Sequence, residues 1–202
     1  MTSVKAWAEK AREMKEKGLS DREIAEELHL SPETIAWLLT RRESSEHPPV
    51  DVKIGWRSVG VMGSRMDMLA MIFVDIIEEE VKKSGKEVDI VVGLPMNGIP
   101  LATLVSSLLD AELTLYRKPA DNACEMPGCF MSNYASIEGK KAVIIDDVIG
   151  TGETMKNAIK ALKDEGAEPV LGMVFVNKTQ HNMLEEVPIR ALVRARAVAG
   201  QM

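Results

Sequence analysis

Cysteine and histidine are scarce in this chain, which narrows the kinds of site it can hold. Only two cysteines and three histidines occur among its 202 residues. Cys124 and Cys129 lie close together, but the histidines lie elsewhere, and such a set is too sparse for a zinc site. We therefore expect unpaired thiols, with a redox-sensing pair as the alternative.

A long apolar run and an excess of positive charge are also missing. No stretch reaches the length needed to cross a bilayer, and the start of the chain is polar and helix-like rather than typical of a signal peptide. We therefore expect a cytoplasmic protein without a membrane partner. Because the formal net charge is −6, any contact with nucleic acid must come from a local surface.

The chain has enough apolar sequence for a packed core, divided between two regions. Hydrophobic residues make up 46% of the total. A break with paired serines, paired prolines and scattered charges separates the regions at residues 41–50. We predict a domain at 1–43, a linker at 44–63 and a larger domain at 64–202. Within the linker, residues 53–56 and 58–62 suit two short strands, either a wing on the first domain or an edge of the second.

Three helical stretches are expected in the first region. Residues 4–17 are amphipathic, and Gly18 ends that pattern. Ser20 and Glu23 have the spacing of a capping box for a helix at 21–28. The third helix begins after this one, so the first region is predicted to be a small all-α domain.

The second and third stretches have an apolar spacing that closes a tight corner between two helices. Ser31 and Pro32 are typical of the N-cap and first residue of a helix, and the small Ala25 allows close approach. This pattern resembles a helix-turn-helix. His29 stands at the usual glycine position, which His tolerates because it adopts positive φ more readily than most residues.

The resemblance implies that the third helix binds operator DNA with its outward side. Acidic and basic residues nearly balance over residues 1–43, so charge alone does not separate this function from a helical bundle used for dimerisation or as a lid. The length of the match to the helix-turn-helix pattern favours DNA binding. The implied DNA-binding residues are Ser31, Glu33, Thr34, Trp37, Arg41 and Arg42.

Helical and strand-like segments alternate through the larger region. Such alternation predicts an α/β fold with a parallel sheet flanked by helices. The expected elements before the central motif are a long helix at 64–84, a strand at 88–92, a helix at 99–109 and a strand at 112–116. After the motif a further strand is expected at 169–176.

The central motif, from Val143 to Thr154, combines a β-branched run, two adjacent acids and a loop of Gly and Thr. The run predicts a buried strand, and helix-forming residues follow from Met155. The loop therefore lies at a helix N-terminus, where backbone amides and the helix dipole suit a phosphate. Asp146 and Asp147 are themselves anions, so their expected partners are sugar hydroxyls or Mg²⁺.

This segment resembles the phosphoribosyl pyrophosphate (PRPP) motif of the type I phosphoribosyltransferases. An ordinary buried strand with a Gly-rich turn would explain the apolar run but not the acids followed at this distance by Thr-Gly-Glu-Thr. The resemblance implies that the acids hold the ribose hydroxyls, with Mg²⁺ as the cofactor, and that the loop wraps the 5′-phosphate. The implied residues are Asp146, Asp147, Gly150, Thr151, Gly152, Glu153 and Thr154.

A second loop bounded by glycines, residues 93–98, precedes the helix expected at 99–109. It is similar to the pyrophosphate loop of the orotate branch of that family. Asn97 stands where relatives often have a lysine, so weaker pyrophosphate binding is expected. Arg117 and Lys118 resemble the family's basic pair near pyrophosphate, with a solvated strand end as the alternative. The implied residues are Leu94, Pro95, Met96, Asn97, Gly98, Arg117 and Lys118.

One departure from the enzymes of this family concerns residues 120–138, which contain no Lys, Arg or His. In orotate phosphoribosyltransferases the corresponding loop supplies cations that stabilise the departing pyrophosphate. Without them, transfer would lose about two or three orders of magnitude in rate while binding could remain. At 187–196, alternating apolar and basic residues predict an edge strand, either a hood over a ligand or an edge protected by charge.

Together these features resemble the archaeal orotate-phosphoribosyltransferase-like regulators, in which a helix-turn-helix precedes a type I phosphoribosyltransferase domain. The resemblance implies a dimeric transcriptional regulator that binds operator DNA and senses PRPP, a nucleotide or a phosphorylated sugar. The alternative is an active phosphoribosyltransferase of the orotate or purine type that uses Mg²⁺. We assign no catalytic residue from the sequence.

Overall fold

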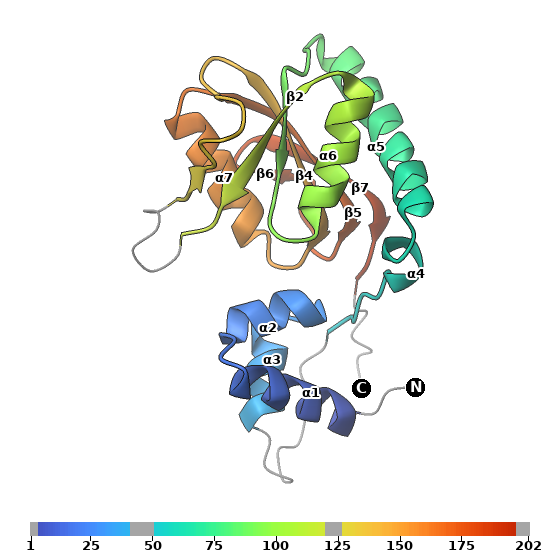
Figure 1. Cartoon of the computed structure of the whole chain (residues 1–202), viewed down its shortest axis with the longest axis vertical. Helices are drawn as coiled ribbons and strands as arrows, with labels where there is room; N and C mark the ends of the chain where they lie inside the picture. Colours follow the sequence, from blue (N-terminus) through green and yellow to red (C-terminus); the bar gives the residue numbers. More distant parts are fainter. Residues whose placement is uncertain (1–3, 41–50, 120–126, 197–202) are drawn as a thin grey trace. The chain divides into compact units, whose positions relative to one another are not determined.

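The computed structural model describes residues 4–40, 51–119 and 127–196. The chain divides into two compact units, one of Met1–Trp56 with Ala195–Met202 and one of Arg57–Arg194. The division between Trp56 and Arg57 falls inside the segment predicted as the linker. Each unit has a hydrophobic core of its own (Figure 1).

The described residues of the first unit form three helices: α1 (Val4–Glu16), α2 (Asp21–Leu28) and α3 (Pro32–Thr40). They lie where the sequence predicted helices. Their inward sides meet in one small core, because the apolar residues recur at helical spacing. The buried residues of this core are Ala8, Ala11, Ile24, Ala25, Leu28, Ile35 and Leu38.

The ends of α2 confirm the predicted capping chemistry. The Ser20 N–H donates to Glu23 Oε2 at 2.7 Å, and the Glu23 N–H donates to Ser20 Oγ at 3.3 Å. These two bonds are the capping box. At the other end His29 adopts a φ of 50°, the left-handed conformation that the turn requires.

The strands predicted in the linker do not form. Within the described residues 51–62 there is no strand, and Arg57–Gly60 is a short helix, α4. The Val61 N–H donates to Arg57 O at 3.1 Å and so continues the helical turn towards the next helix. Residues 51–56 are irregular, and two of their side chains, Asp51 and Lys53, bind helix ends in the first unit. The predicted wing is therefore wrong.

The second unit is built on a seven-stranded sheet of order β3-β2-β1-β4-β5-β7-β6. Its five central strands pair in parallel, which confirms the predicted sheet, whereas β3 and β6 add antiparallel edges. The strands are β1 (Ile90–Gly93), β2 (Glu112–Arg117), β3 (Cys129–Phe130), β4 (Lys141–Ile149), β5 (Glu168–Asn177), β6 (Met183–Leu184) and β7 (Val187–Arg194).

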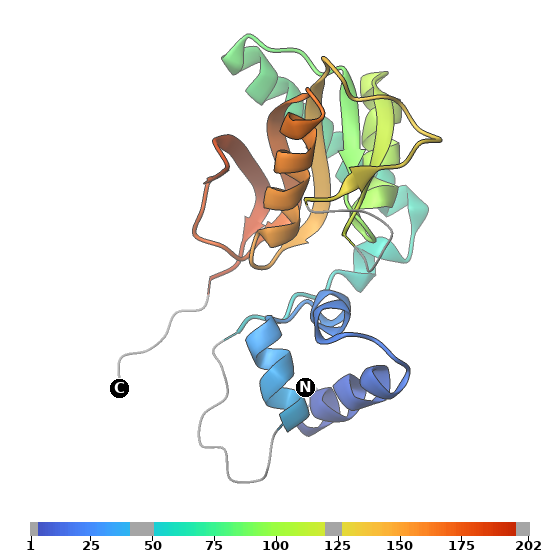
Figure 2. The same cartoon turned by 90° about the vertical axis from the view of Figure 1, so that its left-hand side faces the viewer.

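Three long helices cover the two faces of this sheet. Helices α5 (Gly63–Ser84) and α6 (Gly98–Leu109) lie on one face, and α7 (Glu153–Asp164) lies on the other (Figures 1 and 2). On the first face α6 packs on β1 and β4, while α5 packs on α6 and β5. Burial on both faces explains why the central strands are nearly continuous apolar runs.

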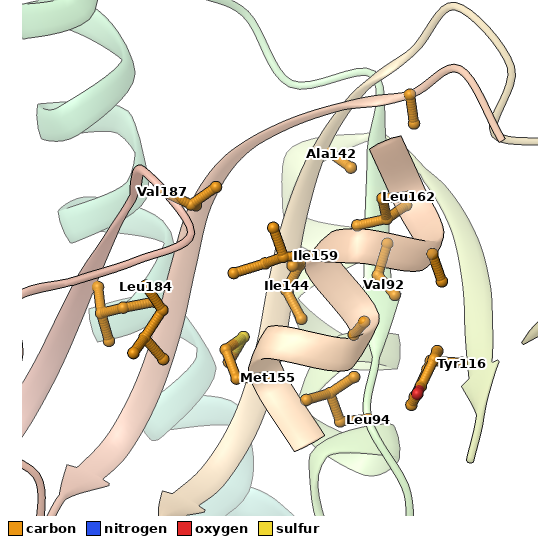
Figure 3. Packing of buried hydrophobic residues seen from close by; sticks show 14 of the residues in the cluster. Val92, Leu94, Tyr116, Ala142, Ile144, Met155, Ile159, Leu162, Leu184 and Val187 are labelled. Carbon is orange, nitrogen blue, oxygen red and sulfur yellow. The ribbon is translucent and has the colours of Figure 1, made fainter. Parts of the chain in front are cut away.

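The core beneath α7 shows how the central motif is anchored. Figure 3 shows Ile159 and Leu162 of α7 packed over Val92 of β1 and Ile144 of β4. All four side chains are fully buried. This packing fixes α7 against β4 and thereby fixes the loop that joins them.

The strand predicted at 187–196 forms as β7, but β6 rather than β7 is the last strand of the sheet. β7 pairs with β5 along one side, while β6 meets only its residues Val187 and Pro188 on the other. Most of that side of β7 is therefore a sheet edge.

Candidate functional site

The carboxyl ends of the parallel strands bring the predicted ligand residues to one edge of the sheet. β1 leads into the loop before α6, β4 leads into the loop before α7, and β2 ends at Arg117. β1 pairs directly with both β2 and β4. The two predicted phosphate loops are therefore neighbours, at the edge where open α/β sheets bind ligands.

The two adjacent acids lie within β4, which continues past them to Ile149. Asp146 and Asp147 are both buried. The Asp147 N–H donates to Asp146 Oδ1 at 2.9 Å, and Asn97 Nδ2 donates to Asp147 Oδ2 at 3.1 Å. Asn97 thus ties the loop after β1 to the acid pair. From the sequence, Asn97 was notable only as the replacement of a lysine, and nothing there indicated its bond to Asp147.

The electrostatics of the pair are unfavourable in the ligand-free protein. Burial raises the pKa of Asp146 well above the usual carboxyl value, and the charge of Asp147 raises it further. The charge of Lys118 acts in the opposite direction and lowers the pKa of Asp146. A hydroxyl donor or a cation bound at Asp146 would stabilise its ionised form, because either would replace the lost solvation.

Asp146→Asn is expected to raise the thermal stability of the ligand-free protein in EDTA by a few degrees near neutral pH. A carboxyl with a raised folded-state pKa contributes stability below its unfolded pKa, and this stability is lost as pH rises through the folded pKa. The asparagine amide does not titrate, so the difference in thermal stability between the variant and wild type should grow from about pH 4 upward. Thermal unfolding across this range measures it, and parallel pH profiles for both proteins would contradict it.

The loop between β4 and α7 has the shape expected of an anion site. Gly152 has a φ of +86°, which favours glycine, and it precedes the first residue of α7. Thr151 Oγ1 accepts a hydrogen bond from the Glu153 N–H at 3.3 Å. Gly150, Thr151 and Glu153 are exposed and Thr154 is half-buried. The helix N-terminus is therefore accessible to a phosphate.

Gly98 begins α6 in direct contact with β4. A Cβ atom at this position would lie 2.5 Å from Ile145 O and 2.9 Å from Asp146 Cα. Both are backbone atoms, which cannot move aside as a flexible side chain would. Only glycine therefore allows the start of α6 to lie beside the acids.

The other residues of the loop after β1 take different roles. The Leu94 side chain is fully buried, and its N–H donates to Ile145 O at 3.0 Å. Its prediction as a pyrophosphate contact is corrected to a structural role, since the side chain is buried and the N–H is already bonded to β4. Met96 is 79% exposed and follows Pro95 through a cis peptide bond. The exposed part of this loop is thus Met96 rather than Leu94.

The segment after Lys118 corrects the expectation of unpaired thiols. Cys129 is disulfide-bonded, and no free cysteine occurs in the part of the chain that the structure describes. Cys124, the other cysteine in the sequence, lies outside the described residues. β3 pairs Cys129 with Arg117 of β2. Spacing alone could not show that the chain returns to β2 here and holds Cys129 in a strand.

The outward side of α3 differs from the sequence prediction. Thr34 is buried and its N–H donates to Ser31 Oγ at 3.1 Å, while Trp37 packs against the helical core. The prediction that these two residues face outward is therefore wrong, since both pack within the helical unit. Ser31 is half-buried. Arg41 and Arg42 lie outside the described residues. The exposed residues of α3 are Glu33, Ala36 and Thr40.

Two charged residues that the sequence did not single out hold the turn between α2 and α3. Asp51 Oδ2 accepts hydrogen bonds from the Ser31 N–H at 2.6 Å and Thr34 Oγ1 at 3.0 Å. Lys53 Nζ donates to Leu28 O. A carboxylate thus lies at the positive end of α3 and an ammonium at the negative end of α2. The only sequence signal was an acid and a base two positions apart, because the residues that they bind at the helix ends lie 20 and 25 positions earlier in the chain.

Two other features, a cluster of metal-binding side chains and a membrane-spanning helix, are absent from the described residues. No group of three or more His, Cys, Asp or Glu side chains there could hold a metal ion. In the same part of the chain, none of the helices has the length and apolarity to span a bilayer. A metal ion near Asp146 and Asp147 would therefore need further ligands from a bound molecule.

Known proteins resemble this chain at two levels. Residues 67–193 match the family described as phosphoribosyl transferase domain. Adenine phosphoribosyltransferase of Saccharomyces cerevisiae has a TM-score of 0.57 at 17% identity, covering 85% of this chain and 97% of that one. The enzyme of Rhodothermus marinus has a TM-score of 0.56 at 19% identity, covering 73% and 89%. These two similarities show the fold alone.

Relatives of similar length are much closer in sequence. The transcriptional regulator GfcR of Thermoplasma acidophilum is 48% identical over 200 residues, covering 99% of this chain and 100% of that protein. The transcriptional regulator GfcR of Picrophilus torridus is 46% identical over 194 residues, covering 96% and 98%. Both alignments run through the helical unit as well as the sheet unit. The chain therefore belongs to the family of transcriptional regulators named GfcR.

Proposed function

We propose that this protein is a DNA-binding transcriptional regulator whose sheet unit senses PRPP, a nucleotide or a phosphorylated sugar. The observation that carries the proposal is the meeting of the acid pair with two Gly-bounded loops at one edge of the sheet, in a chain nearly half identical to named regulators. One loop suits a phosphate and the acids suit the hydroxyls of a sugar.

The ligand would occupy this edge in a defined orientation. Asp146 and Asp147 would accept hydrogen bonds from ribose hydroxyls, and the loop from Gly150 to Thr154 would hold the 5′-phosphate at the start of α7. Lys118 would stabilise a pyrophosphate group, because its positive charge already acts on Asp146. Arg117, exposed at the end of β2, is proposed to assist it.

Mg²⁺ fits this site only together with such a ligand. Two carboxylates are present, and Mg²⁺ in nucleotide sites is commonly held by one or two carboxylates plus phosphate oxygens. Asp146 and Asp147 would be its protein ligands. The ion would supply positive charge that neutralises the acids and the bound phosphates.

Asp147→Asn is expected to weaken PRPP binding at least about 10-fold, because it removes a carboxylate acceptor and its charge. Calorimetric titration with PRPP and Mg²⁺ measures the effect. Asp164→Asn is the matched control, since Asp164 is exposed at the far end of α7. Equal affinities for wild type and Asp147→Asn would refute the role of Asp147.

The DNA part of the proposal is tested by footprinting on the gene's own upstream region, with and without PRPP. A dimeric regulator should protect two half-sites about 10 base pairs apart or a multiple of that spacing. PRPP should change the extent of protection, because an effector acts by favouring one arrangement of the dimer. No protection at moderate salt would contradict the DNA-binding role.

An active phosphoribosyltransferase remains the second candidate, because the acid pair and both loops are retained. The feature against it is the absence of Lys, Arg and His from residues 120–138. Incubation of the purified protein with PRPP, Mg²⁺ and each common base separates the two functions. Robust release of pyrophosphate would support the enzyme.

A further inference from the structure

Helix α5 carries an exposed apolar surface. Met68, Met71 and Ile72 are 52%, 52% and 49% exposed, whereas Phe73 and Ile77 on the opposite side of the helix are fully buried. Figure 1 shows α5 as the outermost helix on its side of the sheet unit. Single exposed apolar residues are common, but three large ones so close together on one helix indicate a contact surface.

The charges beside this surface are arranged symmetrically. Arg65, Met68, Ile72 and Asp75 recur at alternating helical spacings of three and four, so they share one side of α5. Arg65 and Asp75 are both exposed and carry opposite charges at the two ends of the apolar pair. When this order is set against its own reverse, the cation meets the anion and the apolar residues meet each other.

A second α5 lying antiparallel to the first would match this order residue by residue. With the two-fold axis at the level of Ala70, Arg65 faces Asp75 of the partner subunit, and Met68 faces Ile72 of the partner subunit. The same contacts then recur by symmetry, as an isologous interface requires. A parallel arrangement would set Arg65 against Arg65 of the partner subunit and lose both ion pairs.

We propose that a second copy of this chain docks antiparallel on the α5 face formed by Arg65, Met68, Met71, Ile72 and Asp75. The proposal rests on the dimeric regulator proposed above and names the surface that makes the dimer. A membrane surface does not fit this face, because one base and one acid flank the apolar residues in place of a basic rim.

The test measures self-association of the full chain by sedimentation velocity over a range of concentrations. Wild type is expected to be a dimer. Asp75→Arg should raise the dimer Kd at least about 10-fold, because like charges then meet at both symmetric positions. Combining Arg65→Asp with Asp75→Arg reverses both charges and should restore the Kd to within about 3-fold of wild type.

Asp67→Arg is the matched control, because Asp67 is an exposed acid of the same helix but lies off the paired side. It makes the same change of charge and should leave the Kd unchanged. Circular dichroism of each variant checks that the helices are retained. Recovery in the double reversal shows in addition that Asp75→Arg did not act by unfolding the protein.

The outcomes separate this surface from the dimeric regulator itself. A wild-type dimer that is insensitive to Asp75→Arg, or a double reversal that fails to recover, places the interface elsewhere and overturns the α5 pairing alone. A wild-type monomer, even with operator DNA, overturns both. A monomer whose α5 face binds a different protein also overturns the pairing.

Discussion

Gly98→Ala is expected to eliminate PRPP binding and to lower the free energy of unfolding by about 3 kcal/mol. The added methyl group would lie 2.5 Å from Ile145 O and 2.9 Å from Asp146 Cα. Relief requires α6 to move away from β4, since both contacts are backbone atoms. That movement would separate Asn97 from Asp147, which are joined at 3.1 Å. Stability and ligand binding are therefore expected to fall together.

Gly63→Ala is the matched control for this change. Gly63 is also the first residue of a long helix, and a Cβ atom there would meet nothing within 4 Å. Urea unfolding and PRPP calorimetry on both variants make the comparison. The explanation fails if Gly98→Ala unfolds at the same urea concentration as wild type, or if Gly63→Ala loses as much stability.

Most of the fold could be predicted because its signals are local. The capping box of α2 needs only Ser20 and Glu23, and the buried strand β4 is visible as a β-branched run. β3 and β6 were not predicted, since strands of two residues exist only through their pairing with β2 and β7. The order of strands in the sheet is likewise set by contacts between distant segments.

The predicted wing was wrong for a related reason. Residues 53–56 have a composition that suits a strand, but their conformation is decided by partners far away in the sequence. Asp51 binds Ser31 and Thr34, and Lys53 binds Leu28. Local propensity could not reveal these bonds, because each depends on how α2 and α3 are placed.

Within the site, it was easier to predict which residue types could bind a ligand than to predict which of these residues are buried. The acid pair and the loop before α7 follow from residue types at fixed spacing, and the structure brings them together with Asn97. Leu94 was misassigned because motif membership does not say which residues of a loop face inward. Thr34 could have been placed correctly, since it lies one helical turn before the apolar Leu38 and therefore on the buried side of α3.

Ala36→Glu is expected to weaken operator binding by about 100-fold. Ala36 lies between Glu33 and Thr40 on the exposed side of α3, which is the side a recognition helix would turn towards the major groove. A carboxylate there would meet DNA phosphates and the acceptor groups of the bases, and the charge would lose its solvation in the groove. Fluorescence anisotropy with the upstream DNA at fixed salt measures the change.

Ala36→Gln separates the effect of charge from that of size, since its side chain closely matches that of glutamate. If α3 lies in the groove, Gln should bind DNA much better than Glu, and the gap should narrow as salt rises, because salt screens the repulsion. Equal loss in both variants would mean that size alone matters at this position. Binding like wild type in both would show that this side of α3 does not face DNA, and circular dichroism would establish that the helices had formed.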